Sequence, residues 1–196
     1  MKKTIILAMI LVLLLSLLCG CTNEMANYQT LNTLSSQSYQ QVVVTIVSKL
    51  DVELTASMLV TVEGDKTKVQ YTYQQLSTFD TQNTPSSFIT NKAGNIVVQG
   101  GKIVEQNGEP VDQTYVALAT NGFTFSPSYF ANTRFSIGQT NVFTASVTNP
   151  ASFTGNPNLV CSDMKVIISY GQKFQQIQLT YTSQNQGSVS ITYNFS

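Results

Sequence analysis

The feature that most constrains this 196-residue chain is a long alternation of apolar and polar residues that starts at Val42. From Val42 to Val62 most apolar side chains fall on even-numbered positions, while Thr45, Asp51 and Glu63 stand among the odd ones. Successive side chains of a β-strand point to opposite faces of a sheet. The alternation therefore predicts antiparallel strands with one buried and one solvated face.

The alternation changes parity where a turn is expected. Beyond Gly64-Asp65 the apolar residues become odd-numbered, and they change parity again at Gly171-Gln172. A two-residue hairpin produces such a change, and Gly in its first position suits a type II′ turn. At Lys49-Leu50-Asp51 the parity is kept, so a three-residue loop and one long bent strand both remain open.

About nine strands can be counted in this way, mostly joined by hairpins. We therefore expect a mostly β (α+β) fold, in which a single antiparallel sheet curves into a half-barrel and carries short helices. Residues 112–135 are long for a connection. Ser126-Pro127 begins like a helix, so short helices are expected near residues 31–40 and 127–131, with a further helical turn at 149–153.

The first twenty residues read as an export signal. Lys2 and Lys3 precede an apolar run over residues 5–18, which is shorter than the ~20 residues that span a bilayer. The run ends in Leu18-Cys19-Gly20-Cys21, which resembles the bacterial lipobox. This resemblance implies a diacylglyceryl group on the Cys21 thiol, cleavage after Gly20 and usually acylation of the new amino terminus.

The lipobox resemblance sets the expected domain boundaries: a signal peptide over 1–20, a lipidated tether over 21–30 and a β-rich globular domain over 31–196. It implies an extracytoplasmic protein held at the cell membrane, because two or three acyl chains retain a protein there. An uncleaved anchor helix is the alternative. Thr22 leaves a Gram-positive surface and a Gram-negative outer membrane both open.

Composition argues against several functions. The chain has no His, which removes the commonest general base and the commonest transition-metal ligand, so we expect neither an enzyme nor a metal or cofactor site. Loss of Lys2 and Lys3 with the signal leaves eight basic against ten acidic residues, which argues against a nucleic-acid partner. Cys161 has no intramolecular partner in the mature chain and is expected as a small buried residue.

Other chemistry-bearing residues favour ordinary surface. The Gly-Gly-Lys run at 100–102 lies between two short expected strands and is typical of a hairpin turn rather than a phosphate cradle. The carboxylate pairs Asp51/Glu53 and Glu105/Glu109 stand on a polar strand face and beside a turn, so solvated surface is favoured over a catalytic or calcium site.

Aromatic residues concentrate within the long connection. Lining a concave sheet, they would form an apolar pocket; otherwise they fill the core beneath it. The candidate ligand-binding residues are Phe123, Phe125, Tyr129 and Phe130.

The expected architecture, a lipid anchor followed by a helix, a curved antiparallel sheet and a late helical insertion, resembles the half-barrel lipoproteins. These include the LolA/LolB lipoprotein carriers and the mycobacterial lipid-binding lipoproteins. The resemblance implies a non-catalytic, membrane-anchored protein that binds a hydrophobic or lipid-like ligand. A structural, adhesive or protein-binding surface lipoprotein is the alternative, since tyrosine favours protein interfaces.

Overall fold

The protein folds around one open antiparallel sheet. The computed structural model describes residues 24–37, 39, 41–49, 52–81, 84–110, 113–184 and 187–196, so the signal peptide and Cys21 lie outside the described residues. The strands are β1 (Gln41–Lys49), β2 (Val52–Glu63), β3 (Lys66–Thr81), β4 (Thr84–Gln99), β5 (Lys102–Gly108), β6 (Phe130–Ser136), β7 (Asn141–Val147), β8 (Ser162–Tyr170), β9 (Phe174–Ser183) and β10 (Gly187–Phe195). The expected mostly β fold with a single antiparallel sheet is confirmed.

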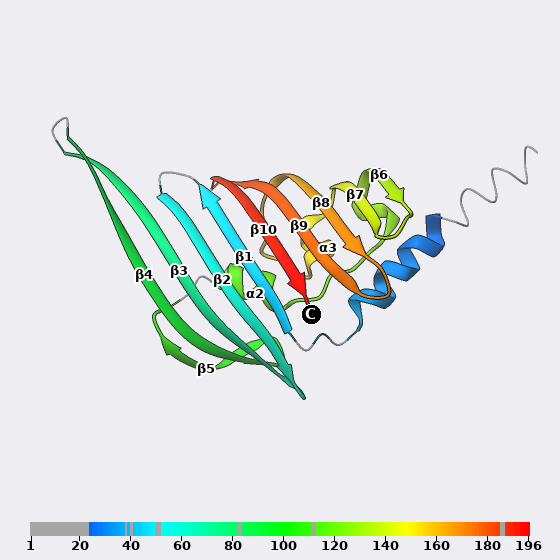
Figure 1. Ribbon diagram of the computed structural model, residues 1–196, viewed down its shortest axis with the longest axis horizontal. Helices are drawn as coiled ribbons and strands as arrows, with labels where there is room; N and C mark the ends of the chain where they lie inside the picture. Colours follow the sequence, from blue (N-terminus) through cyan, green and yellow to red (C-terminus); the bar gives the residue numbers. More distant parts are fainter. Residues whose placement is uncertain are drawn as a thin grey trace, which may run out of the picture.

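The strand order places the two ends of the domain side by side. The sheet runs β5-β4-β3-β2-β1-β10-β9-β8-β7-β6, so β1 and β10 pair at its centre (Figure 1). From β1 the chain runs outward to the β5 edge and crosses the sheet through α2 (Gln113–Thr120) and η1 (Pro127–Tyr129). It enters the opposite edge at β6 and returns to the centre. Among the described strands β5 and β6 do not pair, so the sheet stays open.

The hairpin expected at Gly64-Asp65 is confirmed. β2 ends at Glu63, β3 begins at Lys66, and these two residues pair. Gly64 has φ 63°, the positive value that the first position of a type II′ turn requires. The choice left open after Lys49 is decided in favour of a turn: β1 and β2 are separate strands, with Lys49 opposite Glu53.

The two-residue hairpin expected at Gly171-Gln172 is wrong. The connection there has three residues, because β8 ends at Tyr170 and pairs with Phe174, the first residue of β9. A three-residue loop alone would keep the parity. The register also slips at this point, since Ser169 pairs with Gln176. This β-bulge adds one unpaired residue to β9, and it is the bulge that changes the parity.

The amino-terminal helix lies earlier than expected. Residues 24–35 are helical, whereas we expected a tether up to residue 30 and a helix over 31–40. Tyr28, Leu31 and Leu34 are buried at helical spacing, so Tyr28 belongs to the apolar stripe that the sequence reading began at Leu31. Tyr39 is buried beyond the end of this helix.

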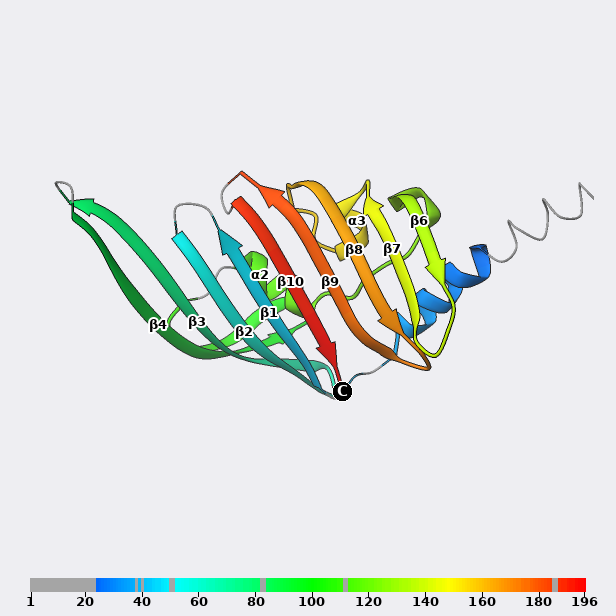
Figure 2. The same cartoon turned by 45° about the horizontal axis from the view of Figure 1, so that its top comes forward.

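Short helices cover one face of the sheet. The helix expected near 127–131 is present only as the 3₁₀-helix η1, which ends at Tyr129, because Phe130 begins the strand β6, which the sequence reading did not predict. The turn expected at 149–153 is α3 (Pro150–Thr154), capped by the Asn149 side chain, which accepts from the Ser152 N–H. The sequence reading missed α2. These helices and residues 24–35 pack on the same side of the sheet (Figures 1 and 2). The core lies between the two layers.

Candidate functional site

The aromatic residues singled out in the sequence lie on the helix-covered face. Phe123, Phe125 and Tyr129 belong to the connection between α2 and β6, which runs beneath the helix over residues 24–35, and Phe130 is the first residue of β6. The Asn32 side chain holds this connection on both sides of Phe125: its Nδ2 donates to the Phe125 carbonyl at 2.7 Å, and its Oδ1 accepts from the Phe125 N–H at 2.8 Å. Ser35 Oγ donates to the Phe123 carbonyl at 2.5 Å. The helix therefore fixes the path of the aromatic segment.

Phe125 and Phe130 are core residues. Their rings stack with centroids 6.1 Å apart, and each ring also packs edge-to-face against Phe153. Phe125 is 3% exposed and Phe130 is 8% exposed. Tyr129 is half-buried against the same cluster. A ligand-binding role for these three residues stays a prediction; the rings of Phe125 and Phe130 contact other rings rather than open space.

Phe123 differs from the other three because it borders a groove. Its ring packs against Phe153 and Tyr193, with both centroid distances 5.1 Å. Beside it lies a groove of about 250 Å³ between the helix-covered face and the ends of the central strands. The groove is lined by Ser35, Gln37, Tyr39, Val42, Val60, Val62, Thr67, Ala119, Thr120, Asn121, Gly122, Phe123, Phe174, Tyr193 and Phe195.

The groove carries no charged side chain among these lining residues. Its two tyrosine hydroxyls are engaged: Tyr193 donates to the Leu118 carbonyl at 2.9 Å, and Tyr39 donates to the Leu34 carbonyl at 3.1 Å while accepting from the Phe174 N–H at 3.0 Å. Burial raises the pKa of both tyrosines, so both stay neutral donors. Such a surface suits an uncharged apolar group.

The strand residues of this groove were not named as site residues in the sequence analysis. Val42 and Val60 were recognised only as members of the alternation over residues 42–62. They and Phe195 come together because β1 pairs with β2 on one side and β10 on the other, with Val42 opposite both Val60 and Phe195. The pairing of β1 with β10 joins residues at opposite ends of the domain. No local sequence signal marks that contact.

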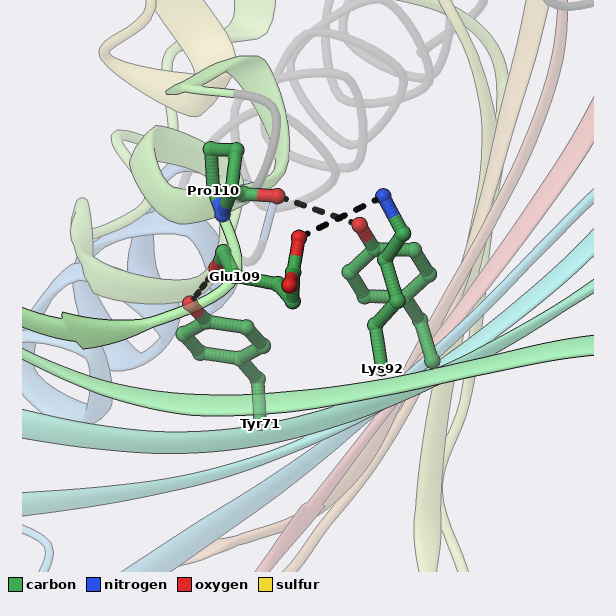
Figure 3. Close-up of polar contacts among 5 residues, drawn as sticks. Tyr71, Lys92, Glu109 and Pro110 are labelled. Carbon is green, nitrogen blue, oxygen red and sulfur yellow. Dashed lines mark hydrogen bonds and ion pairs between the residues drawn. The ribbon is translucent and has the colours of Figure 1, made fainter.

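Apart from the groove, a polar cluster holds the chain where it leaves the sheet after β5 (Figure 3). The Tyr71 hydroxyl donates to the Glu109 carbonyl, and the Tyr73 hydroxyl donates to the Pro110 carbonyl at 3.1 Å. Lys92 Nζ lies 3.7 Å from the Glu109 carboxylate and 5.7 Å from the centre of the Tyr73 ring. The Tyr73 hydroxyl and the Glu109 carboxylate raise the pKa of Lys92. The cluster fastens the crossing segment to β3 and β4.

The carboxylates considered earlier do not form a site in the described part of the chain. Glu109 belongs to the cluster above, and Glu105 is exposed on β5. Asp51 and the side chain of Glu53 lie outside the described residues. No group of three or more potential metal-ligating side chains occurs within the described ranges. No helix in these ranges is long and apolar enough to cross a membrane.

Comparison with known proteins gives little to set beside this geometry. No protein-family model matches the chain, and no curated protein matches it. Among solved structures it is similar to the dehydratase domain of the CurF module of the curacin polyketide synthase, with 11% identity, coverage of 84% of this chain and 77% of that chain, and a TM-score of 0.21. The dehydratase domain of the CurK module is similar with 9% identity, coverage of 85% of this chain and 76% of that chain, and a TM-score of 0.20. Superpositions this loose carry no argument about function.

Proposed function

We propose that this protein is a non-catalytic surface lipoprotein, anchored to the membrane through Cys21, that binds a hydrophobic or lipid-like group in the groove beside Phe123. The lipobox resemblance at residues 18–21 supports the anchor. The uncharged apolar groove on the helix-covered face supports the binding role, and it is the observation that carries the proposal.

The architecture supports a likeness to the LolA/LolB half-barrel carriers. An open antiparallel sheet with helices against one face is the arrangement that a half-barrel requires. We expect a ligand of such a fold to lie against the concave face of the sheet, on the side that the helices cover. The groove occupies this position, at the boundary between α2, the end of the helix over residues 24–35 and the strands β1, β2 and β10.

The size of the groove limits its ligand. Pockets that enclose a drug-sized molecule measure about 300–1,000 Å³. At about 250 Å³ the groove holds part of such a molecule, such as the end of an acyl chain or one aromatic ring. Val62 at its rim is 47% exposed, so the remainder of a longer ligand would extend into solvent there.

A pair of valine variants tests the proposal. Val62 lines the groove, whereas Val104 on β5 is 49% exposed and does not. The measurement is titration of the mature protein with a fluorescent fatty acid, together with native mass spectrometry for co-purifying lipid. Val62→Asp should weaken probe binding about tenfold or more, because a carboxylate in the groove must lose water when the probe enters. Val104→Asp should leave probe binding unchanged.

Three results would count against the binding role: no co-purifying lipid together with no probe binding by the wild type, equal losses in the two variants, or no loss in Val62→Asp. The first would leave the protein-binding alternative in place. The second would mean that the probe responds to surface charge rather than to the groove.

One observation favours that alternative. β3 and β4 form a hairpin that extends past β2, whose last partner in β3 is Ser77, and β5 covers β4 only from Gly94 to Gln99 (Figure 1). Within the described residues the outer edge of β4 before Ala93 therefore has no partner strand. Exposed edges pair readily with an extended segment of another chain. Sedimentation of the mature protein would show whether copies of the chain associate.

A further inference from the structure

The amino-terminal turn of the helix over residues 24–35 lies beside the connection between β6 and β7. The Tyr28 ring packs edge-to-face on Phe135 near the end of β6 and on Phe143 near the start of β7, with centroid distances of 5.5 and 5.9 Å. Both ribbon views show the helix next to this end of β6 (Figures 1 and 2). Met25 precedes Tyr28 by three residues, which places it on the same helical face one turn earlier. Met25 is 51% exposed.

The connection between β6 and β7 carries a second exposed aliphatic side chain. Ile137 follows Phe135 by two residues and is 77% exposed. Residues 137–140, Ile-Gly-Gln-Thr, contain no charge. Within the turn, Asn141 Oδ1 accepts from the Gly138 N–H at 3.3 Å. Ile137 lies at the same end of the molecule as Met25, because Phe135 contacts Tyr28.

The anchor lies close to this end. Cys21 precedes Glu24 by three residues, so their Cα atoms lie within about 11 Å of each other for any conformation of the chain between them. A lipidated Cys21 would therefore bring the first helical turn and the 137–140 connection to the bilayer surface. A more distant surface of the domain has no such constraint.

We propose that Met25 and Ile137 form a membrane-contacting edge, which inserts into the interface of the bilayer that holds the Cys21 lipid. The inference rests on the proposed lipid anchor and adds the orientation of the domain. Ile137 stands on an uncharged turn, and Met25 stands beside the exposed Glu24. Exposed aliphatic side chains suit the boundary between headgroups and acyl chains. Contact there would hold the sheet at a defined angle to the membrane rather than leave it to swing about the anchor.

The chain has no tryptophan, so a single introduced one reports its own surroundings. Ile137→Trp is compared with Val160→Trp. Val160 is 78% exposed and precedes β8, whereas the 137–140 connection adjoins the end of β8, because Asn141 pairs with Tyr170. The nine residues of β8 separate the two positions by roughly 27 Å. Both variants are prepared as the mature lipidated protein in phosphatidylcholine vesicles, with and without brominated acyl chains.

We expect Ile137→Trp to lose about half of its emission in brominated vesicles and Val160→Trp to lose almost none. Equal emission from Ile137→Trp in brominated and ordinary vesicles would overturn the inference, as would equal quenching of both variants. Mass spectrometry of each variant first establishes the acyl group, so absence of lipidation is recognised as a failure of the proposed anchor instead.

Discussion

Phe123 and Phe130 are seven residues apart, before and at the start of β6, but they have different surroundings. Phe130 is 8% exposed, and its ring contacts those of Tyr28, Phe125, Phe143 and Phe153. Phe123 is half-buried and borders the groove. Sequence reasoning grouped the two residues because both are aromatic and both fall within the long connection expected over residues 112–135. Phe130 packs against Tyr28, whereas Phe123 packs against Tyr193, and these two partners come from opposite ends of the chain.

This difference predicts that truncation of Phe130 mainly lowers stability, whereas truncation of Phe123 mainly weakens probe binding. Phe130→Ala should lower the free energy of unfolding by about 3–5 kcal/mol, because it leaves a cavity among packed rings. Phe123→Ala should cost about half as much stability and should weaken binding of the fluorescent fatty acid more than Phe130→Ala does. Urea unfolding and probe titration on both variants provide the measurements. A Phe123→Ala protein with wild-type probe affinity would remove Phe123 from the binding site.

Buried tyrosines predict how stability depends on pH. Burial raises the pKa of Tyr28, Tyr39, Tyr170 and Tyr193 above the ordinary value of 10.0. The unfolded chain then releases these protons at a lower pH than the folded one, so their contribution is fully present below about pH 10 and is lost as the pH rises further. Denaturant unfolding between pH 8 and 11 should show this loss. Tyr170→Phe should make it shallower; an unchanged slope would mean that Tyr170 does not contribute.

At the scale of elements, the exit from β5 depends on two glycines. Gly94 and Gly108 pair across β4 and β5, and the Tyr71 ring lies over Gly94, where its hydroxyl reaches the Glu109 carbonyl. A Cβ on Gly94 would meet the Tyr71 hydroxyl and lie 2.6 Å from the Asn107 carbonyl oxygen. Because Gly94 has no side chain, the Tyr71 ring can lie over it and its hydroxyl can hold the Glu109 carbonyl where the chain leaves the sheet.

Gly94→Ala should accordingly destabilise the protein by about 1–3 kcal/mol, the usual cost of overpacking a filled site. Gly138→Ala is the matched control, because the nearest atom to its added Cβ lies 3.8 Å away and its φ is not positive. Thermal and urea unfolding of the two variants should therefore differ. Equal stabilities would indicate that the neighbouring atoms move aside at no cost and that the hydrogen bond between Tyr71 and Glu109 does not depend on this glycine.

The elements differ in how far the sequence predicted them. The turn at Gly64-Asp65 was predictable because its parity change has a local cause. The parity change near Gly171 comes from a bulge beside a three-residue loop, and alternation alone cannot separate this combination from a two-residue turn. α2 was missed because Gln113–Thr120 includes Thr, Tyr and Val, which favour strands, and its helical form depends on packing. Tyr115, for example, donates to Ser48 Oγ of β1 at 3.3 Å.

For the molecule as a whole, the central pairing of β1 with β10 is the feature that the sequence did not reveal. Hairpins follow from neighbouring segments, and the meanders β1–β5 and β7–β10 could be outlined from alternation, whereas β6 lies where a connection and a short helix were expected. Their joining through Val42 and Phe195 is a contact between the two ends of the domain, and it brings Val42, Val60 and Phe195 to one groove. The candidate site therefore belongs to the complete sheet rather than to either half.

The lipid anchor gives the remaining prediction at this scale. In cells that express the full chain, the wild type should be recovered without residues 1–20 and with acyl groups on Cys21. Cys21→Ala should keep the precursor mass and carry no acyl group, because the thiol that accepts the diacylglyceryl group is gone. Cys19→Ser is the matched control, since it replaces the other cysteine of the lipobox with a small residue and should be processed as the wild type is.

Intact-protein mass spectrometry of the membrane fraction distinguishes these species, whereas detergent partitioning alone does not, because an uncleaved apolar signal also enters detergent. An unacylated wild type, or normal acylation of Cys21→Ala, would remove the anchor and with it the membrane-contacting edge, while the apolar groove would still be open to the fatty-acid titration.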